Sequence, residues 1–228
     1  MSSYFDFFNR FRRPPEVVKQ HQAIFLKYFM GCKNVLDIGC GRGEFLELLG
    51  ENGIGCDGID VNDEMVEYCR KKGLNARKID AAAYLRNIDN NSLDGIFTDD
   101  LIEHLDANYL MRMLRLCRQK LLKSRYLVAK TVNPLSWTSF AGIYLLDVTH
   151  KTPLHPETMR FLMESSGFKE VEVEFVSCLP EDKRLQKVEI TPAMSDGEKR
   201  IARAYNHNVD RLNEAIFGYE NYAAIGKK

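Results

Sequence analysis

The spacing of apolar and polar residues along this 228-residue chain alternates between a strand-like period and a helix-like period. Short apolar runs predict strands at 33–38, 54–60, 76–79, 94–98 and 126–132. Apolar residues three or four positions apart predict helices at 15–29, 43–51, 63–72 and 109–123. Beyond them, the same patterns predict helices at 157–166 and 195–217, and strands at 171–176 and 221–225. Strands that alternate with helices through short connections favour parallel pairing in a doubly wound α/β sheet.

One stretch, Val35–Phe45, combines a buried strand, a tight turn and the start of a helix. Its alternate glycines, Gly39, Gly41 and Gly43, leave no side chains where the chain turns and where a ligand can contact the backbone. The helix that follows directs its free N–H groups at this turn. In such sheets ligands bind beyond the carboxyl ends of the strands, which is where this turn falls. We therefore expect a nucleotide-type ligand here.

The spacing of the glycines distinguishes between two kinds of ligand. The dinucleotide fingerprint of oxidoreductases is G-x-G-x-x-G, but Glu44 occupies the third glycine position in this chain. An acidic residue at the helix start repels a pyrophosphate, so a nicotinamide-dependent oxidoreductase is the weaker alternative. Asp60, at the end of the second predicted strand, can accept both hydroxyls of a ribose. Asp80 ends the third predicted strand, where an acceptor could meet an adenine amino group.

These residues together resemble the class I S-adenosylmethionine-dependent methyltransferases. The matching segments are 35–44, 58–61, 79–81 and 93–105, and the resemblance covers about residues 30–177 plus the final strand. It implies a three-layer Rossmann-like sandwich with a seven-stranded, mostly parallel sheet and an antiparallel last strand. It also implies an enzyme that uses S-adenosyl-L-methionine as its cofactor.

The resemblance further implies roles for individual residues. Asp37 and the Gly39 backbone would lie near the methionine amino group, and Asp60 would bind the ribose. The other residues implied at the cofactor are those next to these motifs or at the ends of the third and fourth strands: Cys40, Gly41, Val61, Asp80, Ala81, Thr98 and Asp99.

The loop at 133–157 follows the fifth predicted strand, so we expect it to lie over the acceptor side of the site. Residues 147–168 are similar to a segment of methyltransferases of polysaccharide synthesis, including those that terminate O-antigen chains. We therefore expect O-methylation of a small-molecule or glycan-type acceptor; the alternative is a non-catalytic adapter that binds the cofactor. His150 and Tyr144 are the candidate catalytic residues, with His150 acting as a base or binding an anionic acceptor. Otherwise His150 anchors the loop, and His155 caps the next helix.

Metal binding is not expected from the sequence. Asp147, His150 and His155 could form a metal site, but no companion cluster supports one. The pair Glu103–His104 follows the fourth predicted strand, where a structural hydrogen bond explains it as well as a role in the site. None of the six cysteines forms a C-x-x-C pair, and their spacing does not resemble a disulfide framework.

Charge and composition exclude several classes of protein. Lys plus Arg and Asp plus Glu both count 32, so bulk nucleic acid is disfavoured as a partner. No apolar run is long enough to span a membrane, and the N-terminus lacks the apolar core of a signal peptide. We therefore expect a cytoplasmic protein. Arg10, Arg12 and Arg13 are interpreted as a solvated basic arm.

We expect a single methyltransferase domain over residues 1–228. It divides into an N-terminal arm and helix (1–31), a cofactor-binding core (32–132), the loop 133–157 and C-terminal helices and strands (158–228). The aromatic residues in positions 5–11 predict a packed arm or lid, with a dimer contact as the alternative. The helix at 195–217 is expected to cover the sheet or the mouth of the site, or else to form the interface of a homodimer.

Overall fold

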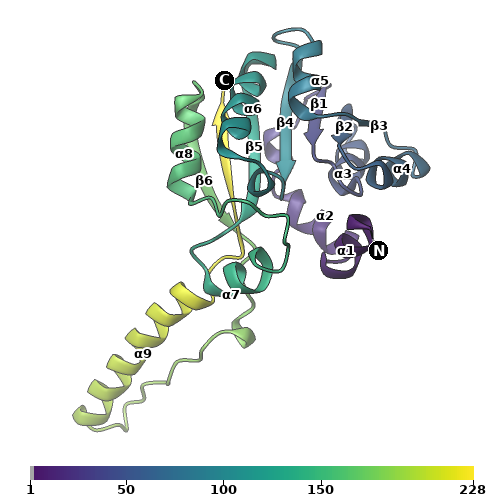
Figure 1. Cartoon of the computed structure of the whole chain (residues 1–228). Helices are drawn as coiled ribbons and strands as arrows, with labels where there is room; N and C mark the ends of the chain where they lie inside the picture. Colours follow the sequence, from purple (N-terminus) through teal and green to yellow (C-terminus); the bar gives the residue numbers. More distant parts are fainter. Residues whose placement is uncertain (1–2) are drawn as a thin grey trace.

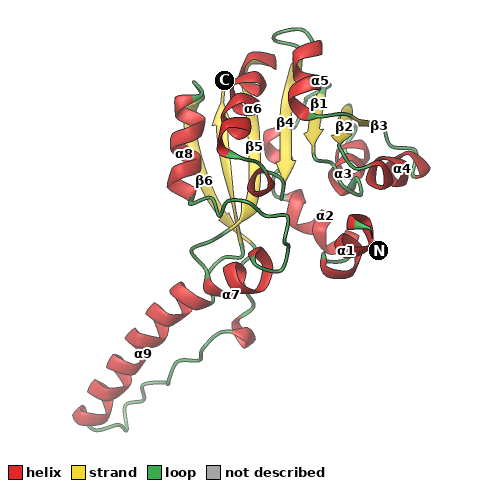
Figure 2. Cartoon of the chain, in the orientation of Figure 1, coloured by secondary structure: helices red, strands yellow, loops and turns green. Residues whose placement is uncertain are grey.

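The sheet has seven strands in the order β3-β2-β1-β4-β5-β7-β6, in a computed structural model that describes residues 3–228 (Figures 1 and 2). β7 runs antiparallel to both of its neighbours, whereas the pairs among β1 to β5 are parallel. The predicted fold class is therefore confirmed. The strands are β1 Val35–Ile38, β2 Cys56–Asp60, β3 Ala76–Lys78, β4 Leu93–Asp99, β5 Leu121–Val132, β6 Lys169–Val176 and β7 Asn221–Lys227.

Helices cover both faces of this sheet because alternate strand residues are apolar on each side. One face packs against α5 Ala81–Asn87, α6 Ala107–Lys120 and α8 Pro156–Ser165. The other packs against the 3-10 helix η1 Leu26–Tyr28 and α3 Glu44–Glu51, while α2 Pro15–Ala23 and α4 Asp63–Lys71 lie beside α3. These are the layers of a three-layer sandwich.

Aromatic rings form the centre of the second core. Phe45 of α3 stacks on Phe97 of β4 with ring centroids 3.7 Å apart, and Phe29 meets both rings edge-on. All three side chains are fully buried. This packing holds the helix that follows the glycine turn against β4, so the two elements that border the site are fixed to each other.

The register of β1 and β2 brings the predicted acidic residues to one edge of the sheet. Asp37 pairs with Gly58, and β2 ends at Asp60. Because parallel strands have their carboxyl ends on the same side, Asp37, Asp60 and Asp99 at the end of β4 all face the same end of the sheet.

Several boundaries differ from the predicted ones. The helix expected over 15–29 stops at Ala23, and a 3-10 turn replaces its last part. α5 was not predicted, and β5 begins at Leu121, so α6 ends earlier than expected. Within the predicted loop 133–157 the chain forms a short α7, Trp137–Ser139, that continues into a π-helical turn, η3 Phe140–Tyr144.

The N-terminal residues form a helix, α1 Tyr4–Phe11, that the sequence pattern alone did not show. Ser3 begins it with a capping box in which the Ser3 hydroxyl accepts from the N–H of Asp6 and the Asp6 side chain accepts from the N–H of Ser3. The first two residues of the predicted arm lie outside the described residues.

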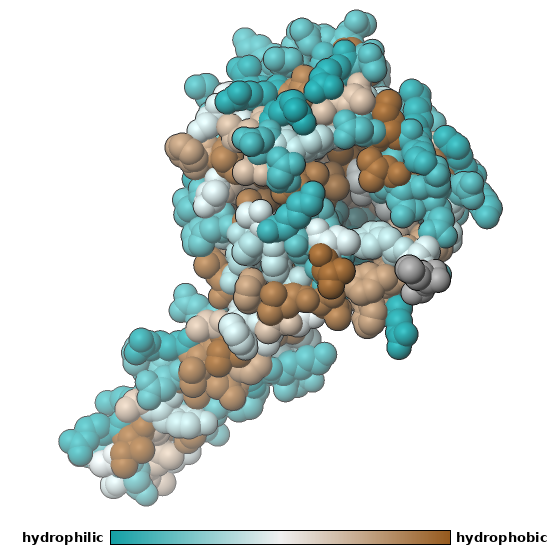
Figure 3. Space-filling view, in the orientation of Figure 1, coloured by the Kyte–Doolittle hydropathy of each residue, from teal (hydrophilic) through white to brown (hydrophobic). Residues whose placement is uncertain are grey.

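The prediction that the helix at 195–217 covers the sheet is wrong. This helix, α9 Asp196–Ile216, points away from the sheet as an arm, and the extended chain before it lies along its side (Figure 1). Asn206 and Asn213 bond the backbone of Val188 and Leu185, so the preceding segment covers the face of α9 that carries these two asparagines. Hydrophobic surface consequently remains on the arm (Figure 3), from exposed residues that include Ile201, Tyr205 and Leu212.

The structure bears on two other expectations. Among the described residues, no helix combines the length and the apolar character that crossing a membrane requires. All six cysteines are free thiols, in agreement with the predicted absence of a disulfide framework.

Candidate active site

The glycine turn has the backbone shape that its sequence predicts. Gly39, Gly41 and Gly43 have φ values of +75°, +52° and +81°, a region that favours glycine. The N–H groups of Gly39 and Cys40 both donate to the carbonyl of Ile59 on β2. The turn is therefore tied to the neighbouring strand and opens toward the carboxyl end of the sheet.

Asp60 holds the other side of this turn. Its carboxylate accepts hydrogen bonds from the backbone N–H of Gly41 at 3.1 Å and of Asn62 at 2.8 Å. Burial nevertheless raises the pKa of Asp60. The side chain is thus fixed in place at the end of β2, with the turn on one side and Val61 on the other.

A pocket of about 290 Å³ lies against the turn, and we call it the glycine-turn pocket. Seven of the ten residues predicted at the cofactor line it: Asp37, Gly39, Cys40, Gly41, Asp60, Val61 and Asp99.

The other three predicted residues lie elsewhere. Asp80 caps α5, where it accepts from the N–H of Ala83 at 2.8 Å and from the hydroxyl of Tyr109 at 2.5 Å. Ala81 is buried at the start of the same helix. Thr98 is also buried, and its hydroxyl makes no hydrogen bond within residues 3–228. The structure therefore gives Asp80 a clear structural task.

The glycine-turn pocket is acidic. Burial raises the pKa of Asp37 well above its ordinary value, and the negative charge of Asp99 adds to this effect. Glu44 also lines the pocket, but the Arg42 guanidinium binds it at 2.6 Å. Carboxylates in such surroundings favour a cationic ligand, because a nearby positive charge restores their ionised form. A ligand that carries a sulfonium and an amino group is cationic in this way, and the glycines leave space for it because they have no side chains.

Helix α1 closes this pocket from the side away from the sheet. A Cβ atom built on Gly41 would lie 3.7 Å from Cζ of Phe8. The guanidinium groups of Arg42 and Arg12 both lie over the Phe8 ring. Tyr4 reaches further, and its hydroxyl donates to Asp147 at 3.0 Å. The placement of α1 agrees with the predicted packed lid.

Arg12 corrects the interpretation of the basic N-terminus as a solvated arm. Only 17% of its side chain is exposed, and its guanidinium binds Asp99 at 3.2 Å and Asp100 at 2.7 Å. The ammonium of Lys130 on β5 binds the same two carboxylates at 2.5 and 3.0 Å. Burial by itself would raise the pKa of Asp100, but Lys130 and Arg12 outweigh it and hold the pKa low. Arg12 is a site residue that local sequence pattern could not reveal.

A second pocket of about 290 Å³ adjoins the first, and we call it the aromatic pocket. It shares Tyr4, Phe8, Arg12, Asp99, Asp100 and His104 with the glycine-turn pocket. Its further lining residues include Phe7 and Phe11 of α1, Glu103 from the segment after β4, Lys130 near the end of β5, and Asp147 and His150 from the loop after η3. The loop 133–157 thus borders the site, as predicted from its position after β5.

His150 reaches the aromatic pocket, whereas Tyr144 lies behind it. The Tyr144 ring stacks on the His150 ring with centroids 4.7 Å apart, and the Tyr144 carbonyl accepts from Nδ1 of His150 at 2.7 Å. Tyr144 itself is buried and lines neither pocket. Tyr144 therefore orients the His150 ring, and of these two residues only His150 can contact a ligand in the aromatic pocket.

The metal site that the loop alone suggested does not assemble. His155 begins α8, where its Nδ1 accepts from the N–H of Glu157 at 3.1 Å, so its predicted role as a cap is confirmed. The residues that do meet His150 are Glu103 and His104, in the 3-10 helix η2 Ile102–His104 after β4. We call these three residues the Glu-His-His corner of the aromatic pocket.

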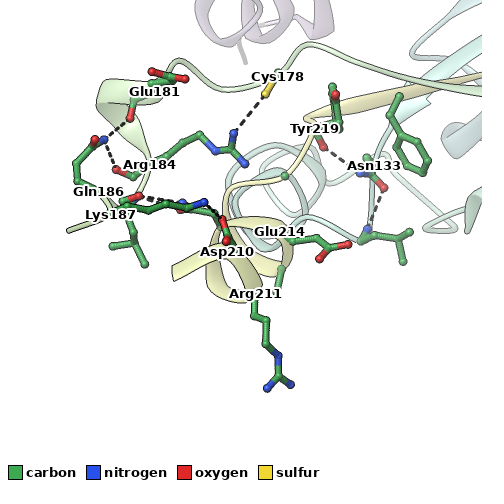
Figure 4. Close-up of a pocket in the computed structure, with 16 residues that line it drawn as sticks. Asn133, Cys178, Glu181, Arg184, Gln186, Lys187, Asp210, Arg211, Glu214 and Tyr219 are labelled. Atoms are coloured by element: carbon green, nitrogen blue, oxygen red, sulfur yellow. Dashed lines mark hydrogen bonds and ion pairs between the residues drawn. The ribbon is translucent and has the colours of Figure 1, made fainter. Parts of the chain in front are cut away.

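A larger hollow than either of these two pockets lies elsewhere. It has a volume of about 950 Å³ and lies between the base of α9 and the segment before it (Figure 4). Its lining includes Arg184, Lys187 and Asp210 but no residue of the cofactor motifs. The volume of a hollow therefore does not identify the cofactor site in this protein.

Comparison with known proteins agrees with this geometry. A SAM-dependent methyltransferase from Archaeoglobus fulgidus is 41% identical, with a TM-score of 0.92, and each chain covers 100% of the other. The family of the methionine biosynthesis protein MetW matches residues 19–127. No sequence among the curated proteins matches.

More distant structures share the fold. A putative methyltransferase from Haloferax volcanii, solved with the Trm112 methyltransferase activator, is 16% identical with a TM-score of 0.64, over 99% of this chain and 97% of that one. Magnesium protoporphyrin IX methyltransferase from Synechocystis, with bound SAH, is 14% identical with a TM-score of 0.59, over 93% and 82%.

The acidic pocket at a glycine turn in a β3-β2-β1-β4-β5-β7-β6 sheet defines a methyltransferase of the class I type. The extent and identity of the Archaeoglobus fulgidus match show that the chain belongs to the SAM-dependent methyltransferases. It is an enzyme of that family, and its cofactor is S-adenosyl-L-methionine.

Proposed function

We propose that this enzyme methylates an oxygen atom of a small-molecule or glycan-type acceptor that binds in the aromatic pocket. The observation that carries the proposal is the position of His150. Its side chain is only 7% exposed, its Nδ1 is held by the Tyr144 carbonyl, and it lines the pocket that adjoins the glycine turn. A neutral imidazole held in this way keeps the lone pair of Nε2 for the acceptor side.

The glycine-turn pocket would hold the cofactor through the residues that line it. Asp60 is proposed to accept from the ribose hydroxyls, and Asp37 and Asp99 to face the cationic end of the ligand. S-adenosylmethionine supplies a methyl group on a sulfonium, which leaves by in-line displacement as the electron pair of the C–S bond returns to sulfur. The chain's own contribution is mainly alignment, which can supply ~7–11 kcal/mol of the barrier.

The aromatic pocket supports a polar acceptor of modest size. Its volume of about 290 Å³ suits a single ring or a short chain. Aromatic side chains of α1 offer flat apolar faces, while charged groups from β4 and β5 offer hydrogen bonds. A sugar or a hydroxylated ring presents both kinds of surface.

An oxygen nucleophile needs to lose a proton, and the Glu-His-His corner favours that loss. Two imidazoles and a buried carboxylate lie together at one end of the aromatic pocket. A hydroxyl placed among them is near groups that can hold a proton or stabilise the ionised oxygen, which contributes ~10²–10⁴-fold in such reactions.

A methyl-transfer assay tests this proposal. The protein is incubated with S-adenosylmethionine labelled in its methyl group and with paired acceptors that carry either a hydroxyl or an amine at one position. We expect the label in an O-methyl product, and we expect His150→Ala to slow the transfer by at least ~100-fold. The control His207→Ala, on the exposed side of α9, should not change the rate.

The assay can also contradict the proposal. Label found only on the amines would remove the oxygen specificity, and an unchanged rate in His150→Ala would remove the role of His150. Tight cofactor binding without transfer to any acceptor class would favour the adapter alternative. The nicotinamide alternative finds no support in the acidic pocket or in the family match.

Two further expectations stay predictions. The free cysteines fit a cytoplasmic location, where thiols are kept reduced. Self-association through the arm is supported by the exposed Ile201 and Leu212 of α9. Sedimentation tests it: a dimer that dissociates in Leu212→Lys would support it, and a monomeric wild type would contradict it.

A further inference from the structure

The Glu-His-His corner is assembled from two segments that are distant in the sequence. Glu103 and His104 follow β4, and His150 comes from the loop after η3. The N–H groups of Lys151 and Thr152 donate to the backbone carbonyl of Glu103 at 2.8 and 3.2 Å, which fixes the loop against η2. One ligand atom of each corner residue lies within 4.8 Å of the other two.

Hydrogen bonds show that Nδ1 of both imidazoles carries a proton. The carboxylate of Asp147 can only accept, so the hydroxyl of Thr149 donates its proton to Asp147 at 2.6 Å. The same hydroxyl must therefore accept from Nδ1–H of His104 at 2.9 Å. The Tyr144 carbonyl also only accepts, so Nδ1 of His150 carries its proton as well. In its neutral form each ring is thus the Nδ1–H tautomer, in which Nε2 keeps a lone pair.

The carboxylate of Glu103 meets these two rings without a partner of its own. It is 1% exposed, and within residues 3–228 neither of its oxygens makes a hydrogen bond. Its Oε1 lies 4.0 Å from Nε2 of His150. Buried polar groups in folded proteins are normally satisfied, so this carboxylate calls for a positively charged ligand.

We propose that Glu103, His104 and His150 bind a divalent transition-metal ion through one carboxylate oxygen and the two Nε2 atoms. Two histidines and one carboxylate form the ligand set of catalytic zinc sites and of non-haem iron sites. The bonds from Nδ1 to Thr149 and to the Tyr144 carbonyl are the outer contacts that orient such ligands.

The proposed ion would also define the acceptor more closely, and this step rests on the proposed function. All three ligands line the aromatic pocket, so the open positions of the ion face the acceptor. With the ion bound, Nε2 of His150 is a metal ligand and no longer a base. The ion then favours loss of the acceptor proton in its place, because a bound metal lowers the pKa of a coordinated oxygen acid by several units. The acceptor is then a hydroxyl compound whose oxygen binds the ion as the anion, with its proton released to solvent.

Metal binding can be measured on the full chain without cofactor or acceptor. The chelator-treated protein is titrated calorimetrically with Zn²⁺, and zinc-loaded protein is examined by X-ray absorption. We expect one ion per chain, with nitrogen and oxygen ligands and no sulfur. Glu103→Gln and His150→Ala should each weaken binding by at least ~10-fold, as even loss of an outer contact can do.

His155→Asn is the matched control. It lies in the same loop, preserves the N-cap of α8 and should leave zinc affinity unchanged. Absence of stoichiometric binding in the wild type would overturn the proposal. Sulfur ligands in the X-ray absorption spectrum, or full zinc affinity in Glu103→Gln, would overturn it too. The spectrum is recorded on the wild type, so it tests the proposed ligands even where a variant does not fold. Because no methyl transfer is involved, these results are independent of the proposed function.

Discussion

Arg12, the residue that directly follows the N-terminal helix α1, binds Asp100 after β4 at 2.7 Å, and this bond helps to hold α1 over both pockets. The contact joins the N-terminal segment to the chain directly after β4. This ion pair and the hydrogen bond from Tyr4 to Asp147 together hold α1 in place. Lys130 binds the same carboxylate from β5, so Asp100 links three elements of the fold.

Replacing Arg12 with glutamine should loosen α1 without unfolding the sheet. The variant loses hydrogen bonds to charged groups, which contribute about 1.5–3 kcal/mol, while Lys130 still neutralises Asp100. Amide hydrogen exchange should become faster in α1 and stay unchanged in β4. Arg10→Gln, at an exposed position of the same helix, is the control. Unchanged exchange in α1 would show that Arg12 does not hold the lid.

Asp60→Asn should weaken cofactor binding by ~10–100-fold, which corresponds to the loss of about 1.5–3 kcal/mol from hydrogen bonds to a charged acceptor. The amide keeps the shape of the side chain, so the turn at Gly41 should survive. Calorimetry with S-adenosylmethionine measures the effect. The control is Asp63→Asn, which should bind the cofactor like the wild type, because the exposed Asp63 side chain pairs with Lys78. Equal affinity in both variants would remove Asp60 from the ribose site.

Asp37→Asn should stabilise the cofactor-free protein and weaken the cofactor complex. The pKa of Asp37 is raised in the folded chain, so the ionised form is disfavoured there relative to the unfolded chain. Wild-type stability therefore falls, relative to the asparagine variant, as the pH rises above the ordinary carboxyl value near 4. Thermal melts at pH 4 and pH 8 should show a larger advantage of the variant at pH 8. The same advantage at both pH values would contradict this explanation.

Phe45→Ala should destabilise the fold by about 3–5 kcal/mol, because the Phe97 and Phe29 rings would border a cavity. Urea unfolding gives the value. Phe161 on α8 is 64% exposed, so Phe161→Ala should change stability by at most ~0.5 kcal/mol. Similar losses for the two variants would mean that the aromatic cluster does not carry the core.

The turn and its acidic residues could be predicted because their signals are local. Strand, glycines and helix start lie within Val35–Phe45, and Asp60 ends the next strand. Asp80 shows the limit of this logic: its position at a strand end was predicted, but α5, which was not predicted, uses the side chain as its cap. A sequence pattern gives the place of a carboxylate and not its partner.

The helix α9 shows why an amphipathic pattern alone does not give a location. The apolar residues that α9 presents would suit a helix on the sheet equally well. Only the bonds of Asn206 and Asn213 to the preceding segment show that this chain covers its own helix. The Glu-His-His corner was missed for a similar reason, because Glu103 and His150 meet through tertiary packing.

A crystal structure of the enzyme with S-adenosylhomocysteine would show whether the cofactor and the acceptor occupy the two adjoining pockets. We expect the ribose hydroxyls to bond Asp60 and the sulfur to face the aromatic pocket, on the side of His104 and His150. A sulfur atom directed away from that pocket, or a ligand bound outside the glycine-turn pocket, would contradict this expectation.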